Sequence, residues 1–114
     1  MSLEMLLLIP ALFALLFTGV QGALLYQARE LCLAAAQEGA REAASQLGSV
    51  GAGVAGAEGF LANSRAGLSA VSVTGQRGAA EASITVSATS VSVVPGWNPR
   101  ITQSASLPVE RLTG

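Results

Sequence analysis

A long apolar stretch near the N-terminus constrains this chain more than any other feature. No charged residue occurs from Met5 to Leu25, and the stretch is interrupted only by Pro10, Thr18, Gly19, Gln21 and Gly22. As a helix rising 1.5 Å per residue, about 21 residues reach roughly 30 Å, the thickness of the hydrocarbon core of a bilayer. The stretch is therefore predicted to span a membrane, and it cannot also be the core of a globular body.

A cleaved signal peptide and a plain single-pass anchor are the two alternatives for this stretch. Val20-Gln21-Gly22 before Ala23 offers the small residues of a cleavage site, but the acidic Glu4 stands where a signal peptide is basic. Cleavage would release a small secreted domain without residues 1–22. An anchor normally carries Lys or Arg on its cytoplasmic flank, and no basic residue precedes Arg29.

The helical pattern continues beyond the apolar stretch. Residues 26–47 are rich in Ala, Leu, Gln, Glu and Arg, which are strong helix formers, and their polar residues recur at spacings of three, four and seven. Glu38 and Arg41 are placed to pair on this helix. We predict one helix over residues 1–47, from about Ser2 to Leu47, hydrophobic in its first half, amphipathic in its second and roughly 70 Å long.

A glycine-rich region over residues 48–67 is predicted to end the long helix and to hold a short second helix from about Ala52 to Asn63. Gly51-Ala52-Gly53-Val54-Ala55-Gly56 in this region matches the pattern G-x-G-x-x-G. A dinucleotide site needs a strand before this pattern and a βαβ unit around it, and here a helix precedes it. Close packing between helices is therefore the interpretation we favour.

Residues 68–114 change to a period of two, which is typical of strands. The segment Gly75–Gly78 is predicted as a hairpin turn, followed by a strand within Ala80–Val94 and a third strand over Ile101–Val109. A shift of phase at Thr89–Ser90 predicts a β-bulge in the second strand. The fold class is α+β, with a long helix, a short helix and a three-stranded antiparallel meander. This sheet is short of large apolar residues, so its missing burial must come from the long helix or from neighbouring subunits.

Composition excludes the common classes of enzyme and nucleic-acid-binding protein. The 114 residues include six arginines, no lysine, no histidine and one cysteine, with a net charge of −1. These numbers leave no basic surface for nucleic acid, no Cys/His zinc site and no intrachain disulfide. We predict a chain that is not an enzyme, with no catalytic, cofactor-binding or metal site. Cys32 is expected to be a packing residue, and Trp97 to cover the small sheet rather than to form an exposed adhesive aromatic.

Two N-terminal motifs carry a family resemblance. The run Ser2-Leu3-Glu4-Met5-Leu6-Leu7-Leu8-Ile9-Pro10-Ala11-Leu12 and the segment Ala34-Ala35-Ala36-Gln37-Glu38-Gly39-Ala40-Arg41-Glu42-Ala43-Ala44 resemble TadE-like pilins of the tight-adherence branch of type IV filaments. The ending Ala105–Arg111 also looks like their closing strand. Gln37 departs from the arginine frequent in the family, and Glu4 lies one place before the usual fifth mature position. No basic leader precedes Met1, which suggests that Met1 is the first mature residue.

The resemblance implies a structural subunit that polymerises through its N-terminal helix into an extracellular filament for adhesion or surface attachment. It implies the chain itself as the main partner, with other pilins, a prepilin peptidase, an assembly ATPase and membrane platform proteins in addition. The subunit would lie in the inner (cytoplasmic) membrane before assembly and in a cell-surface filament afterwards. The alternatives are a minor pilin or pseudopilin and a single-pass membrane-anchored accessory protein of the assembly system.

Seven residues are candidates for assembly or subunit interaction. In a hydrocarbon-like filament core the carboxylate of Glu4 needs a counter-charge, and a free α-amino group, which the resemblance places on Met1, is the natural one. Alternatively, Glu4 is a solvated residue of the first helical turn. Pro10 either kinks the helix or is merely tolerated in a membrane helix. The remaining candidates are small residues that let helices approach, and an arginine of the second motif: Gly19, Gly22, Gly39 and Arg41.

Overall fold

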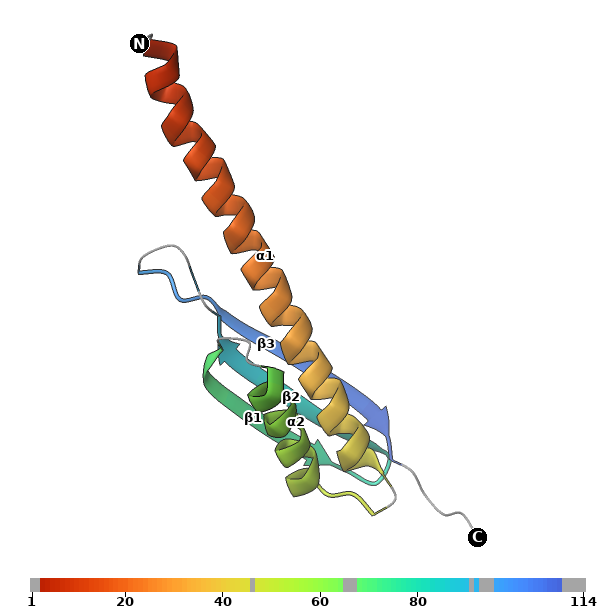
Figure 1. Ribbon diagram of the computed structural model, residues 1–114. Helices are drawn as coiled ribbons and strands as arrows, with labels where there is room; N and C mark the ends of the chain where they lie inside the picture. Colours follow the sequence, from red (N-terminus) through yellow and green to blue (C-terminus); the bar gives the residue numbers. More distant parts are fainter. Residues whose placement is uncertain (1–2, 46, 65–67, 91, 93–95, 110–114) are drawn as a thin grey trace.

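The computed structural model describes residues 3–45, 47–64, 68–90, 92 and 96–109. Its elements follow the order α1 (Leu3–Ala44), α2 (Val50–Ser64), β1 (Ser69–Arg77), β2 (Glu81–Thr89) and β3 (Arg100–Pro108). The molecule measures 80 × 21 × 19 Å, because the first half of α1 extends well beyond the other elements (Figure 1). The α+β arrangement predicted from the sequence is confirmed. We call α2 and the sheet the head.

The long helix α1 contains 42 residues and continues through Pro10 without interruption. A proline inside a helix removes one backbone hydrogen bond, here to the carbonyl four residues earlier. The turns on both sides keep their helical form, so the helix is not locally melted at this position. The helix thus continues across Pro10, and a role of Pro10 in assembly stays a prediction.

Hydrogen bonds at the helix termini fix where α1 ends and where α2 begins. The long helix ends at Ala44, three residues before the predicted end, and the amide of Gly48 donates to the carbonyl of Ser45 at 2.9 Å. The short helix begins at Val50 because Ser49 caps it, accepting from the amide of Ala52 at 3.1 Å. This cap places the start of α2 two residues before the predicted one.

The three strands form an antiparallel sheet in the order β1-β2-β3, which confirms the predicted meander. The first hairpin turns later than the predicted Gly75–Gly78, because β1 remains paired as far as Arg77, opposite Ala82. Gly75 lies opposite Ile84, and a Cβ at Gly75 would lie 2.6 Å from the Ile84 Cδ1. The glycine therefore makes room for a core side chain and does not form the turn.

The bulge lies in a different strand from the one predicted. The second strand ends at Thr89, while Ser69 pairs with Thr89 and Ser72 pairs with Ser87. Three residue steps on β1 thus face two on β2, which places one extra residue in β1. Ala70, inside this irregularity, has a φ of 50°. The predicted bulge at Thr89–Ser90 is wrong, because the change of phase there marks the end of the strand.

The core lies between the second half of α1 and the head. Seven of its fourteen buried residues come from positions 28–44 of α1, and six of those seven are alanines. Ile84, Val86 and Cys32 are the largest side chains that are fully buried. In Figure 1, α1 and α2 lie side by side on the same face of the sheet. The long helix thus supplies the burial that the head lacks.

Candidate assembly surface

Residues 3–20 of α1 are not buried by any other part of the chain that the structure describes. Every residue from Leu3 to Val20 is exposed, including eleven large apolar side chains between Leu3 and Phe17. Among the described residues, α1 is the one helix that is long and apolar enough to cross a membrane. We call residues 3–20 the exposed segment and residues 28–44 the packed segment.

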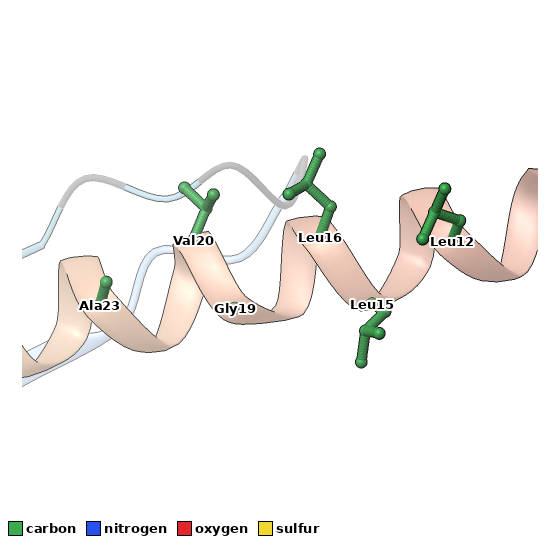
Figure 2. Close-up of a pocket in the computed structure, with 6 residues that line it drawn as sticks. All are labelled: Leu12, Leu15, Leu16, Gly19, Val20 and Ala23. Carbon is green, nitrogen blue, oxygen red and sulfur yellow. The ribbon is translucent and has the colours of Figure 1, made fainter.

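A shallow apolar groove of about 560 Å³ runs along the exposed segment and slightly beyond it. Its lining is formed by Leu12, Leu15, Leu16, Gly19, Val20 and Ala23 (Figure 2). Figure 2 shows Leu16 and Val20 projecting from one side of the helix and Leu15 from the other. A Cβ added at Gly19 would meet no atom within 4 Å. Among the described residues, none outside α1 lines the groove.

The candidate glycines divide between the two segments of the helix. Gly19 and Gly22 are exposed, and a Cβ at either would meet nothing within 4 Å. Gly39 is buried, and its added Cβ would lie 2.6 Å from the carbonyl oxygen of Gly53. The structure thus shows Gly39 packing inside the subunit, whereas no described residue packs on Gly19 or Gly22, and their contact with another helix stays a prediction.

The glycine-rich pattern in α2 brings the two helices together. A Cβ at Gly53 would lie 2.7 Å from both the Ala43 Cβ and the Gly39 carbonyl oxygen. At Gly56, an added Cβ would lie 2.7 Å from a carboxylate oxygen of Glu42. The helices therefore approach at positions where a larger side chain does not fit, which confirms the helix-packing interpretation of G-x-G-x-x-G.

Two charged candidates occupy opposite ends of α1. Glu4 lies exposed in the first turn, and Met1, its predicted partner, falls outside the described residues. The pairing of Glu4 with an α-amino group therefore stays a prediction. Arg41 forms the predicted i,i+3 ion pair with Glu38 at 3.3 Å, and 73% of the Arg41 side chain is exposed. An ion pair this exposed contributes little to stability and leaves the arginine accessible to a neighbour.

Arg77 has a structural role that the sequence did not indicate. Its guanidinium donates to the backbone carbonyls of Ala43, Ser45 and Gly48 at 2.7, 3.0 and 2.6 Å. Carbonyls at a helix C-terminus lack partners within the helix and carry partial negative charge, so a cation is favourable there. The end of β1 thus fixes the end of α1. The sequence places Arg77 only within the predicted Gly75–Gly78 turn, and no local signal links residues some thirty positions apart.

In the sequence Gln21 is only an interruption of the apolar stretch, but the structure gives it a specific contact. Gln21 is 5% exposed, and its Oε1 accepts from the Ser92 hydroxyl at 3.2 Å. The connection between β2 and β3 therefore reaches α1 within the apolar stretch. In the same connection Trp97 is 44% exposed and is not among the side chains packed on the core. The prediction that Trp97 covers the sheet is wrong.

Cys32 is a packing residue, as the sequence predicts. It is fully buried in the core, and burial raises the pKa of its thiol because desolvation disfavours the thiolate. The thiol is therefore poorly reactive in the folded chain. Within the described residues, no group of three or more His, Cys, Asp or Glu side chains is arranged to hold a metal ion.

The match with a known family falls on α1. Residues 1–41 match the model of the family described as TadE-like protein. The matched residues include the whole exposed segment and most of the packed segment, and they contain the first N-terminal motif and the second motif as far as Arg41. The predicted resemblance is therefore confirmed. A search of curated proteins and a search of solved structures find no match.

Proposed function

We propose that this chain is a structural subunit of a Tad-type pilus. In this proposal α1 spans the cytoplasmic membrane before assembly, and then packs with the same helices of other copies in the core of an extracellular filament. The observation that carries the proposal is the exposed segment, a continuous apolar helix that extends from the packed segment and that no other described part of the chain covers. The TadE-like match over residues 1–41 supports the association with a pilus.

The exposed segment requires a partner for physical reasons. Apolar surface in contact with water costs about 25 cal/mol per Å², and soluble monomers rarely expose more than a few hundred Å² in one patch. A bilayer and a bundle of apolar helices both remove this cost. Gly19 and Gly22 have open space at their Cα atoms, which allows a neighbouring helix to approach closely.

The same proposal assigns roles outside the chain. A prepilin peptidase, an assembly ATPase and membrane platform proteins would process and extrude the subunit, and the head would face outward for adhesion or surface attachment. We propose a homopolymer, because the surface along the exposed segment carries a single charge, Glu4, so that identical copies repel little. A minor pilin or pseudopilin and a membrane-anchored accessory protein are the alternative outcomes of the test.

The test uses cells that make the full chain. Material sheared from their surface is imaged by negative-stain microscopy, its subunits are quantified, and the intact mass of the native chain is measured. We expect filaments composed mainly of this chain, with residues 1–22 retained. Filaments composed of another pilin with this chain at trace amounts would indicate a minor subunit, and its absence from sheared material would indicate an accessory protein. A mass lacking residues 1–22 would indicate a secreted domain.

A matched pair of variants tests the surface itself. Gly19→Leu adds bulk to the groove while keeping the helix apolar, so the chain should still enter the membrane but yield far less filament. Gly59→Leu makes the same change on α2, where an added Cβ also meets nothing within 4 Å, and should leave filament yield unchanged. Equal yields from both variants would contradict packing through the groove.

A further inference from the structure

The connection between β2 and β3, at one end of the head, contacts α1 inside the apolar stretch. The Ser92 hydroxyl donates to Gln21 at 3.2 Å, and Gln21 is buried although its neighbours Val20 and Gly22 are exposed. Gln21 lies four residues before Leu25, which corresponds to about 6 Å along the helix. The head-group layer on each side of a bilayer is about 5–8 Å thick beyond a 30 Å hydrocarbon core. When residues 5–25 span a membrane, this end of the head must therefore lie at the membrane surface.

The connection between β2 and β3 holds a large aromatic side chain at this end of the head. The amide of Ser90 donates to the carbonyl of Pro99 at 2.9 Å and closes the base of the connection. Residues 96–99 lie at the end of the sheet that is nearer to the exposed segment (Figure 1). Trp97 stands in this part, 44% exposed, beside Gly96 with a φ of 78°. Trp97 is thus partly accessible at this end of the sheet.

The surroundings of Trp97 suit the boundary between lipid and water. The sequence carries no charge from Ala82 to Pro99 or from Met5 to Ala28, the two segments that meet at Gln21 and Ser92. Tyr26, 68% exposed, lies on α1 about 8 Å beyond Gln21 toward the head. Trp and Tyr concentrate at membrane interfaces because their rings are apolar and their N–H and O–H groups remain hydrated.

We propose that Trp97 inserts into the lipid head-group layer and, with Tyr26, seats the head on the outer surface of the membrane before assembly. The inference rests on the membrane-spanning stage of the proposed function and does not depend on polymerisation. Its consequence is that the head has a fixed orientation on the bilayer, with α2 and the sheet alongside the point where α1 emerges. Assembly would then withdraw Trp97 from lipid.

Trp97 is the only tryptophan of the chain, so the emission of the unmodified protein tests the proposal. The full chain is reconstituted into phosphatidylcholine vesicles whose lipids carry bromine near the head group or near the end of the acyl chain. We expect a clear loss of emission with bromine near the lipid head group and little loss with bromine at the end of the acyl chain. Quenching by aqueous acrylamide alone would overturn the proposal. Quenching that is strongest with bromine at the end of the acyl chain would also overturn it. Shielding from both acrylamide and lipid bromine would overturn it in favour of a contact with another protein surface.

A second variant separates this inference from the proposed function. Phe13→Trp combined with Trp97→Phe moves the single indole to the middle of the exposed segment, where Phe13 is 55% exposed. Bromine at the end of the acyl chain should quench the emission of this variant strongly. If it does and Trp97 of the unmodified chain responds only to acrylamide, the head does not rest on lipid although the helix spans. If it does not, the membrane-spanning stage is wrong, and the seating of the head is wrong with it.

Discussion

The exposed and packed segments of α1 belong to one continuous helix, yet they meet very different surroundings. In the packed segment, small residues such as Ala35, Ala36 and Ala40 are fully buried against α2 and the sheet. In the exposed segment, large residues such as Leu7, Leu8 and Leu15 are more than 60% exposed. Among the described residues, the larger apolar side chains of α1 therefore lie where the chain leaves them exposed, and the smallest lie where it buries them.

The contrast shows that the helix has two separate tasks. Alanine and glycine in the packed segment let α1 lie close to α2, so half of the core residues come from a helix whose other end needs a different partner. Substitutions in the packed segment should change the stability of the subunit, and substitutions in the exposed segment should change insertion and assembly. The following variants separate these two effects.

The largest effect is expected from Glu4→Ala. Glu4 is the only charged residue among the first 28, so its loss removes the one counter-charge available to an α-amino group in the filament core. Filament yield should fall severely while the melting temperature of the purified subunit in detergent stays the same. Glu4→Gln provides the isosteric control and should also leave the melting temperature unchanged. Normal amounts of filament from cells that carry Glu4→Ala would refute the pairing.

Ile84→Ala should produce the largest loss of subunit stability. Ile84 is among the largest fully buried side chains, and truncating such a residue costs about 2–5 kcal/mol. Leu16→Ala removes a comparable volume from the exposed segment and should leave the free energy of unfolding in detergent almost unchanged. Thermal unfolding followed by circular dichroism measures both. Similar losses in the two variants would show that the exposed segment packs within the subunit.

Gly39→Ala should cost about 1–3 kcal/mol, the usual range for overpacking, because its added Cβ would lie 2.6 Å from the Gly53 carbonyl oxygen. Gly59→Ala is the control, since its Cβ would meet nothing and alanine favours helix by up to about 1 kcal/mol over glycine. The two melting temperatures should move in opposite directions. A stabilised Gly39→Ala variant would contradict the close crossing of α1 and α2.

The smallest effect is expected for Arg77→Met, which keeps most of the side-chain stem but removes the donors to three carbonyls at the end of α1. Water can reach these carbonyls in part, so the cost should be about 1–2 kcal/mol. Arg100→Met is the matched control, because the Arg100 hydrogen bonds are exposed and longer, at 3.3 and 3.4 Å. An equal loss of stability in both variants would contradict the capping role of Arg77.

Local pattern was sufficient for most elements of the fold. Helix formers and apolar residues predicted α1 to within three residues at its C-terminal end, and alternation predicted three strands in a meander. The ion pair of Arg41 with Glu38 and the packing role of Cys32 also followed from spacing and neighbours. These features depend on residues close in sequence, where periodicity carries the information.

Contacts between distant residues account for what the sequence did not reveal. Gly19 and Gly39 look alike in sequence, and only the position of α2 separates an open surface from an internal crossing. The cap from Arg77 and the contact of Ser92 with Gln21 each join segments about 30 to 70 residues apart. The extra residue in β1 also depends on pairing with β2, so the change of phase near Thr89 could not locate it.

A helical reconstruction of sheared filaments would test the central claim most directly. The account predicts a filament whose core consists of residues 3–20 of this chain, with the side chains of the groove around Gly19 against helices of neighbouring copies and the head on the outside. A core formed by the helices of a different pilin, with this chain bound at trace stoichiometry or absent, would contradict it.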